Sequence, residues 1–235
     1  MDIRITEFIK GAREAEGLTV IIDVFRAFSV ACYAFDNGIK RIIDVATPEA
    51  ARALKLQIRA DTLLVGEQNE KKPEGFDYCN SPTEMLTAAL EGKTMIHSTT
   101  AGTNGILNAR GASEILGAGI VNAGAVARYI SLVKPKTVTL VAMGYRAVES
   151  AEEDLLCARY IKDLLEGREN DITASLNALR TGSGKRFFDP LNLSFSPPTD
   201  FFLCIDLNRF NFILKAVVTE AGHAEILRVD MNGYG

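Results

Sequence analysis

The sequence lacks the features that would place it in several specialised classes of protein. Its four cysteines lie far apart in 235 residues and form no CxxC pair, which argues against a disulfide framework or a zinc site and favours a reducing, cytoplasmic location. No uncharged run approaches the roughly 18 residues that a transmembrane helix needs. The N-terminal stretch MDIRITEFIKGAREAEG mixes acids with bases and has no apolar core, so we do not expect a secretory signal.

The chain also lacks a strong charge of one sign. Its 26 lysine and arginine residues and 30 aspartate and glutamate residues are mixed along the chain and leave a net charge of −4. This balance gives no indication of a surface for nucleic acid or membrane, and a small-molecule partner is expected instead. With 47% hydrophobic and 24% charged residues, the composition is that of an ordinary globular protein.

Apolar runs that suit strands alternate with helical patterns through the first two thirds of the chain. This alternation predicts a three-layer α/β fold, with a mainly parallel sheet and helices on both faces. The expected strands are residues 18–23, 41–45, 62–65, 94–97, 114–120 and 137–143. The expected helices follow the N-cap and proline pairs at 47–48 and 81–82, and cover residues 123–132 and 152–165.

The last third is less regular. We expect residues 1–170 to form the catalytic core and residues 171–235 to form an elaboration packed on it, which could be a second small α/β subdomain. The end of the chain suggests two strands joined at residues 220–223, with a helical alternative. The apolar segment FFLCIDLNRFNFIL is compatible with a homodimer.

Polar side chains follow several predicted strands at the point where each strand ends. Asp23 and Arg26 follow the first strand. Glu67 follows the third, and Glu153 comes shortly after the last. Because ligands bind at the carboxyl ends of strands in an open α/β sheet, we expect these groups to share one edge. Oxygen ligands such as Asp23 and Glu67 suit Mg²⁺, although Asp23 taken alone could equally cap the following helix.

Two loops carry the groups expected to bind an anion. In STTAGTNG, residues 98–105, small residues let backbone N–H groups approach a phosphate at a helix N-terminus, and the threonine hydroxyls add donors. No GK[ST] follows, so this is not a Walker A loop, and a plain strand-to-helix turn would look similar. The polar segment GEQNEKKPEGFDYCNSPTE, residues 66–84, is long for a connection inside a compact domain, which favours a functional role or a lid.

The two histidines are expected to have structural roles. His97 lies inside a predicted apolar strand, where a core histidine is commoner than a base, although it directly precedes the threonine-rich loop. His223 falls in a predicted turn and is expected to be solvated.

Several stretches, taken in order, resemble the 2-phosphosulfolactate phosphatase family: VIIDVFRAFS, GEQN followed by GFDYCNSP, STTAGT and EEDLLCA. The family pattern has IDVxRA at a strand end, then GERxG and GFDxGNSP, a TTNGT loop and an EDxxCA helix start. The matches are collinear over residues 18–160. The resemblance implies a Mg²⁺-dependent phosphatase that hydrolyses the phosphate monoester of 2-phospho-3-sulfolactate to 3-sulfolactate and phosphate. In methanogens this step belongs to coenzyme M biosynthesis.

The resemblance, together with the strand-end positions, predicts the site residues. The expected ligands of Mg²⁺ are Asp23, Glu67 and Asp154. The expected catalytic residues are Asp23, Arg26, Glu153 and, as general base, Asp77. The expected phosphate-binding residues are Arg26, Asn80, Ser81, Thr99, Thr100, Gly102, Thr103 and Asn104.

Four positions depart from the family pattern. Gln68 stands in place of arginine, Glu70 and Cys79 in place of glycine, and Ala101 in place of asparagine. The loss of a cation at position 68 matters most, because a substrate with phosphate, sulfonate and carboxylate groups needs positive partners. The cations that could compensate are Arg26, Lys71, Lys72, Arg146 and Lys185.

Three alternatives remain at this point. Asp23 could act as a nucleophile and form an aspartyl-phosphate, but enzymes of that kind use a D-x-D motif and position 25 is phenylalanine. Cys79 with Lys93 could serve an isochorismatase-like cysteine hydrolase. The threonine-rich loop alone could make a non-catalytic anion-binding module.

Overall fold

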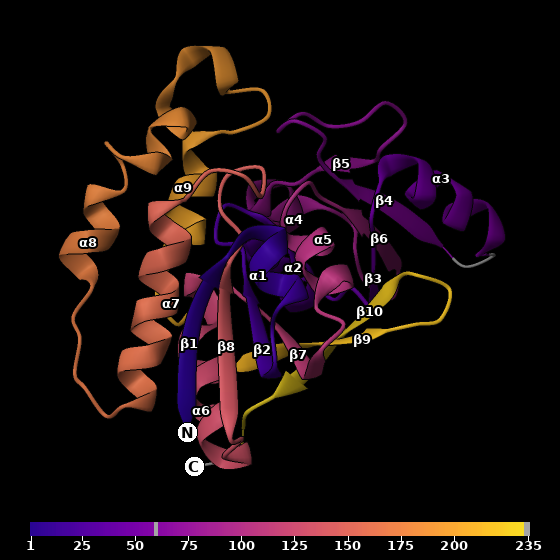
Figure 1. The fold of residues 1–235 in the computed structure, drawn as a ribbon. Coiled ribbons are helices and arrows are strands. Elements are labelled where there is room, and N and C mark those ends of the chain that lie inside the picture. Colours follow the sequence, from indigo (N-terminus) through magenta and orange to yellow (C-terminus); the bar gives the residue numbers. More distant parts are fainter. Residues whose placement is uncertain (59–60, 233–235) are drawn as a thin grey trace.

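One sheet contains the ten strands found in the described residues, 1–58 and 61–232, of this computed structural model. The strands are β1 (Asp2–Glu7), β2 (Gly17–Ile22), β3 (Arg41–Val45), β4 (Thr62–Gly66), β5 (Tyr78–Cys79), β6 (Thr94–Ser98), β7 (Ala112–Ala118), β8 (Thr137–Ala142), β9 (Phe212–Val218) and β10 (Ala224–Asp230). Across the sheet their order is β1-β8-β2-β7-β9-β10-β3-β6-β4-β5 (Figure 1).

Helices cover the sheet and fill much of the C-terminal third. The α-helices are α1 (Phe8–Arg13), α2 (Ala27–Asp36), α3 (Pro48–Gln57), α4 (Pro82–Thr87), α5 (Gly102–Asn108), α6 (Ala123–Val133), α7 (Glu152–Leu165), α8 (Thr173–Ala178) and α9 (Pro198–Cys204). The 3-10 helices are η1 (Ile120–Asn122), η2 (Ser183–Phe188) and η3 (Pro190–Asn192). Thr47 and Ser81 cap α3 and α4 as predicted, each accepting a backbone N–H with its hydroxyl oxygen.

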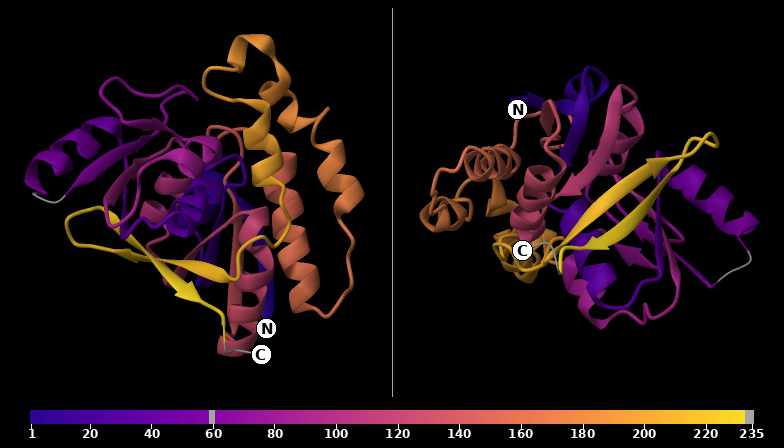
Figure 2. Two further views of the ribbon diagram at one scale, coloured as in Figure 1. Left: turned by 180° about the vertical axis from the view of Figure 1, so that it is seen from behind. Right: turned by 90° about the horizontal axis from the view of Figure 1, so that it is seen from below.

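The sheet consists of two parallel halves joined by a hairpin. Strands β1, β8, β2 and β7 are parallel to one another, and so are β3, β6, β4 and β5. The β9–β10 hairpin lies between the halves and pairs antiparallel with β7 on one side and β3 on the other. Each of these two junctions spans three residue pairs, and the hairpin runs obliquely to both halves in Figure 2. The prediction of a mainly parallel α/β sheet is therefore confirmed.

Strand β2 is buried on both faces, which explains its unbroken apolar run. Leu18, Val20 and Ile22 pack on one face with residues of α6 and α7, whereas Ile21 packs on the other face with residues of α2 and α5. Successive side chains of a strand point to opposite faces, so a central strand covered on both sides needs apolar residues throughout.

The C-terminal third combines short helices with the hairpin. Residues 173–204 form short helices, of which α8 lies beside α7 in Figure 1, and the two predicted end strands are confirmed as β9 and β10. The apolar segment at 201–214 packs within the same chain, where Phe201, Phe210 and Phe212 are buried. It therefore gives no specific support for a homodimer. The division at residue 170 stays a prediction. Within the described residues, no helix is both long and apolar enough to cross a membrane.

Candidate active site

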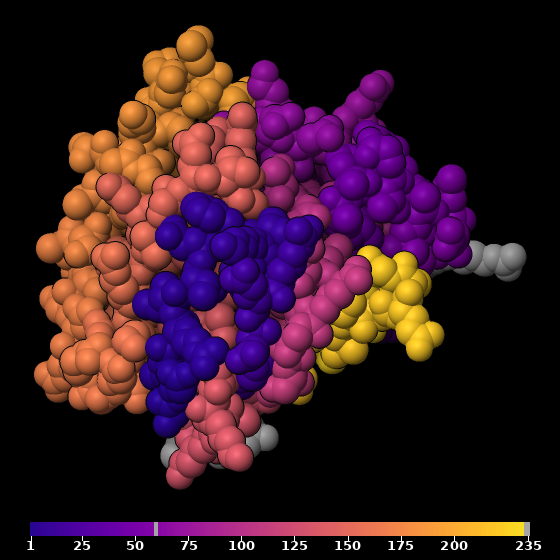
Figure 3. Space-filling view, viewed as in Figure 1, coloured from indigo at the N-terminus to yellow at the C-terminus, as the bar shows by residue number. Residues whose placement is uncertain are grey.

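A cavity that is open to solvent lies where strands of both halves end. It is lined by residues that follow β2, β4, β6 and β8, together with a residue of η2. Those residues are Asp23, Phe25, Arg26, Glu67, Glu70, Asn80, Thr100, Ala101, Gly144, Tyr145, Arg146, Glu153, Asp154 and Arg186. In Figure 3 the C-terminal helical segment, in orange, adjoins the segment after β4, in purple, at the upper edge of the molecule. The structure thus brings Asp23 and Glu67 to one cavity.

Asp23 directly follows β2 and is almost fully buried. Its Oδ1 accepts the Ala27 N–H at 3.2 Å, so it holds the start of α2 as well as facing the cavity. Burial, with a smaller contribution from the nearby charge of Glu67, raises the pKa of Asp23 to about 6, although hydrogen bonds from Ala27 and Gly102 lower it. Gly102 is needed here because a Cβ at that position would lie 2.8 Å from Asp23 Oδ2.

Glu67 occupies donors that the sequence assigned to a phosphate. Its Oε1 accepts the Thr100 N–H at 2.6 Å, and its Oε2 accepts the Thr100 hydroxyl at 3.1 Å and the Glu70 N–H at 2.8 Å. The threonine-rich loop therefore already binds an anion, which is a carboxylate of the same chain. A carboxylate has about four lone-pair sites, so Glu67 can still accept a further ligand.

Other predicted phosphate ligands of this loop hold the loop together instead. Thr99 and Thr103 each accept the other's backbone N–H with the hydroxyl oxygen, at 3.0 and 3.1 Å. Asn104 does not line the cavity, and its amide donates to the carbonyl oxygens of Ala46 and Thr99. The sequence identified the correct loop but could not tell which of its donors were already used.

The acids at the start of α7 differ in their partners. Asp154 accepts the Val24 N–H with Oδ1 and the Gly144 N–H with Oδ2, both at 2.8 Å, so it ties the ends of β2 and β8 together. Glu153 is also buried, but its Oε2 has no hydrogen-bond partner among the described residues. Burial raises the pKa of both carboxyls. Glu153 is thus the acid of this pair that is free to act on a ligand.

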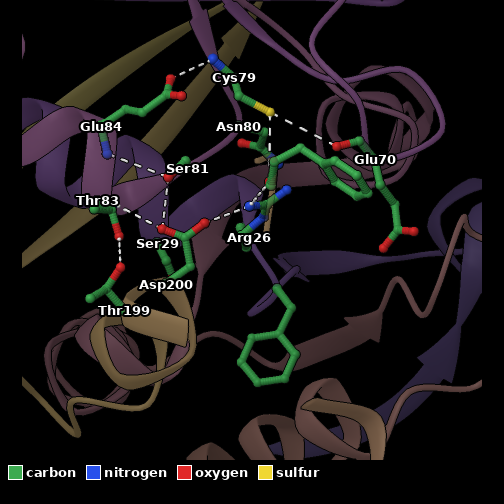
Figure 4. A network of polar contacts seen from close by, with 12 residues as sticks. Arg26, Ser29, Glu70, Cys79, Asn80, Ser81, Thr83, Glu84, Thr199 and Asp200 are labelled. Atoms are coloured by element: carbon green, nitrogen blue, oxygen red, sulfur yellow. Dashed lines mark hydrogen bonds and ion pairs between the residues drawn. The ribbon is translucent and has the colours of Figure 1, made fainter. Parts of the chain in front are cut away.

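Arg26 is buried in a network that reaches the C-terminal third (Figure 4). Its guanidinium donates to Asp200 at 2.5 Å and to the Phe195 carbonyl at 2.7 Å. Asp200 also accepts the Ser81 hydroxyl at 2.7 Å and the Thr83 N–H at 3.0 Å. Ser81, predicted to grip phosphate, therefore binds Asp200 and does not line the cavity.

A second guanidinium in the cavity, that of Arg186, was missed by the sequence prediction. Arg186 lies on η2 and donates to Glu70 Oε1 at 2.6 Å and to the Phe25 carbonyl at 3.0 Å, while its buried Nε has no partner among the described residues. The predicted cation was the neighbouring Lys185, which is exposed. No local motif marks this position, because Arg186 reaches the site from far along the chain.

Glu70 stands at a position where the family pattern has glycine, and the backbone explains that preference. Its φ is +70°, in the left-handed region that glycine adopts without strain. The Glu70 side chain bridges two elements, since Oε1 pairs with Arg186 and Oε2 accepts the Tyr145 hydroxyl at 3.1 Å. In this chain the departure at position 70 therefore places a carboxylate against the Arg186 guanidinium.

The structure does not bring Asp77, the predicted general base, to the lining of the cavity. Its Oδ2 accepts the Leu64 N–H at 2.7 Å and pairs with Lys55 Nζ at 3.0 Å. Burial alone would raise the pKa of Asp77, but these two partners lower it below its ordinary value. Asp77 therefore fixes the loop after β4 against α3.

The cysteine-hydrolase alternative is not favoured. Burial raises the pKa of Cys79 to about 11, so its thiol is not activated at neutral pH. Lys93, its proposed partner, precedes β6, whereas the cavity lies where β6 ends. Its Nζ lies 3.9 Å from Asp61 Oδ2.

The donor set of the cavity fits a magnesium ion that is held by few protein ligands. The described residues contain no group of three or more His, Cys, Asp or Glu side chains arranged to hold a metal ion. Asp23 and Glu67 nevertheless repel each other across the cavity, and a cation would relieve that repulsion. Mg²⁺ commonly binds one or two carboxylates and completes its shell with water and phosphate oxygens. Each oxygen of Asp154 accepts one backbone N–H group, so Asp154 braces the site, and its predicted role as a further metal ligand stays a prediction.

Known proteins resemble this chain over most of its length. Residues 3–190 match the 2-phosphosulpholactate phosphatase family. A probable 2-phosphosulfolactate phosphatase of Caldanaerobacter subterraneus subsp. tengcongensis is 32% identical over 209 residues, covering 83% of this chain and 86% of the relative. One of the same name from Bacillus subtilis is 35% identical over 176 residues, covering 73% and 75% of the two chains. With a match of this extent across the strands that build the cavity, the chain belongs to the 2-phosphosulpholactate phosphatase family.

Proposed function

We propose that this protein hydrolyses the phosphate monoester of 2-phospho-3-sulfolactate to 3-sulfolactate and phosphate, with Mg²⁺ as its cofactor. Membership of the family makes the chain a phosphoric monoester hydrolase. The observation that carries the proposal is the meeting of carboxylates and guanidinium groups in one cavity, where Asp23, Glu67 and Glu153 face Arg26 and Arg186. A role in coenzyme M biosynthesis and a cytoplasmic location belong to the same proposal.

The cationic and amide groups of the cavity would bind the substrate anions. Arg186 is the better placed guanidinium, because its Nε is unpartnered within the described residues and its carboxylate partner is partly exposed. Arg26 adds positive potential, although much of its charge is balanced by Asp200. Asn80 and the Thr100 loop complete the polar wall. Several such donors are needed because charge-assisted hydrogen bonds are the strong ones for phosphate and sulfonate.

Asp23 and Glu67 would hold Mg²⁺, with water and substrate oxygens as the remaining ligands. When bound, the ion would neutralise negative charge on the phosphoryl oxygens. The two carboxylates would gain from this arrangement, because burial and, to a lesser extent, the charge of Glu67 raise the pKa of Asp23, and a cation would favour its charged form.

Glu153 is our candidate for the proton-transfer group, in place of Asp77. It lines the cavity, its Oε2 is unpartnered within the described residues, and burial raises its pKa, which makes its carboxylate a stronger base. We propose that it accepts a proton from the water that attacks phosphorus. The covalent route through Asp23 is less favoured, because Phe25 packs against Phe187 and Phe201 and provides no second acid.

A phosphate-release assay over small phosphate monoesters, including 2-phospho-3-sulfolactate, tests the proposal. We expect release that needs Mg²⁺ after treatment with a chelator and falls at least about a hundredfold in Asp23→Asn. The matched control is Asp77→Asn, an acid outside the cavity, which should keep most of the activity. Equal rates with and without Mg²⁺ would remove the metal from the proposal. Phosphate binding without turnover of any ester would favour the anion-binding module.

A further inference from the structure

A chain of three buried polar side chains leads from the core to the wall of the cavity. Asp44 on β3 and His97 on β6 are paired residues in adjacent strands, and each is 1% exposed. Asp44 Oδ1 lies 3.4 Å from His97 Nδ1, and His97 Nε2 lies 3.1 Å from Asn80 Oδ1. Asn80 in turn lines the cavity, beside Arg26 in Figure 4. The family resemblance gave no role to Asp44 or His97.

Burial makes an unbalanced charge on Asp44 costly. Apart from His97 Nδ1 at 3.4 Å, neither carboxylate oxygen of Asp44 has a polar partner in the described part of the chain, so His97 is the group that balances its charge. The pair is neutral in two forms, a carboxylate beside an imidazolium or a carboxylic acid beside a neutral imidazole. Removing one more proton would leave a net negative charge in the core, which is costly.

Both neutral forms place a proton on His97 Nε2. An imidazolium carries protons on both nitrogens, and a neutral ring whose Nδ1 accepts a hydrogen bond from the protonated Asp44 carries its own proton at Nε2. His97 Nε2 therefore donates to Asn80, and only the oxygen of the Asn80 amide can accept that bond. The amide nitrogen of Asn80 forms no hydrogen bond within residues 1–58 and 61–232, so it is left to face the cavity.

We propose that His97, backed by Asp44, is a positioning residue that holds the Asn80 amide with its N–H groups toward the substrate anion. A reversed amide would present its carbonyl oxygen to the phosphate and repel it. The inference rests on the proposed function, since it assumes that an anion enters this cavity. It also gives a role in binding to a histidine that has the burial of a purely structural core residue.

Kinetics of three variants test the connection between His97 and Asn80. We expect Asn80→Ala and His97→Phe each to raise KM for the phosphate monoester by about tenfold, with kcat changed less than about threefold. Because His97 acts through Asn80, the double variant should be no worse than Asn80→Ala. An unchanged KM in His97→Phe, or effects that multiply to about a hundredfold in the double variant, would overturn the inference.

Nitrogen NMR of the intact protein provides a second test that does not depend on His97→Phe folding. The sequence has two histidines, so His223→Gln, in the turn between β9 and β10, leaves His97 as the single imidazole. This variant should keep wild-type activity. At neutral pH the ¹⁵N shift of His97 Nε2 should be that of a protonated nitrogen, and an unprotonated Nε2 would refute the arrangement.

Binding of inorganic phosphate separates the two proposals. Calorimetry should show weaker phosphate binding by Asn80→Ala and His97→Phe than by the wild type, whether or not a turned-over ester has been found. Normal turnover by the wild type with unchanged affinity in both variants would refute only the positioning role. Absence of turnover by the wild type would refute only the proposed function.

Discussion

Two arginine–carboxylate pairs border the cavity, and they differ in how much water reaches them. The Arg26 and Asp200 side chains are 3% and 0% exposed, and Asp200 also accepts two further hydrogen bonds. The Arg186 and Glu70 side chains are 18% and 21% exposed. A buried pair cannot exchange partners without leaving a charge unsolvated, whereas a partly hydrated pair can. The first pair therefore serves the fold, and the second can yield its cation to a substrate.

The largest expected effect comes from breaking the buried pair. Asp200→Ala should lower the free energy of unfolding by about 3 to 5 kcal/mol, because it leaves the Arg26 guanidinium buried and uncompensated. Urea unfolding monitored by circular dichroism measures this loss. The matched control is Asp206→Ala, whose ion pair with Arg209 is about half exposed and should matter by less than about 1 kcal/mol. Equal losses in the two variants would contradict the distinction.

Breaking the partly exposed Arg186–Glu70 pair should weaken substrate binding and leave stability nearly unchanged. Arg186→Gln should raise KM for the ester that the wild type hydrolyses by about tenfold to hundredfold. The free energy of unfolding should change by less than about 1 kcal/mol. Steady-state kinetics and urea unfolding of the same preparation measure the two quantities. Lys185→Gln, on an exposed side chain next to it, is the control and should behave as the wild type. A wild-type KM in Arg186→Gln would remove Arg186 from the site.

Asp23 lies in the same cavity and gives a pH dependence that sharpens the comparison. Its folded pKa of about 6 exceeds the ordinary 3.8, so between these values the folded state binds more protons than the unfolded state, and stability falls as pH rises. Asp23→Asn lacks that fall and should be about 1 to 3 kcal/mol more stable than the wild type at pH 8. The gain should vanish below about pH 4. The free energy of unfolding of both proteins, measured at pH 8 and below about pH 4 in the presence of a chelator, tests this prediction. A variant less stable than the wild type at pH 8 would contradict it.

The smallest effect is expected from removing the carboxylate of Glu70, which is paired with Arg186. Glu70→Gln removes the internal carboxylate from the guanidinium and should lower KM about twofold to fivefold. Glu70→Gly should do the same and also relieve the positive φ at this position, so it should be the more stable of the two variants. An increase in KM would mean that Glu70 assists binding rather than competing with it.

Local signals in the sequence predicted the parts of the fold that depend on local chemistry. The apolar runs of β2 and β8 and the caps Thr47 and Ser81 could be identified because propensity, burial and capping act within a few residues. The strand-end acids were found for the same reason, since the carboxyl ends of parallel strands meet at one edge. Strand β1 and helix α1, which carry weaker patterns, were not predicted.

The rest depends on which side chains meet in three dimensions. Asp77 matches the family motif, yet its partner Lys55 could only be identified once α3 was placed beside the loop. Arg186 was missed because a short 3-10 helix brings it to a carboxylate 116 residues earlier in the chain. Donors in the threonine-rich loop looked free because nothing local shows that Glu67 uses them. Pairings of this kind are set by topology, which one sequence does not reveal.

The position of the β9–β10 hairpin has a consequence for synthesis of the protein. Residues 212–230 join the two parallel halves, and they leave the ribosome after the other eight strands that the described residues form. Until then β7 and β3 each have an unpaired edge, which is the kind of surface that recruits other chains. A nascent or truncated product without this hairpin should therefore be prone to aggregation and should have no finished cavity, so the enzyme would become active only when its last strands are in place.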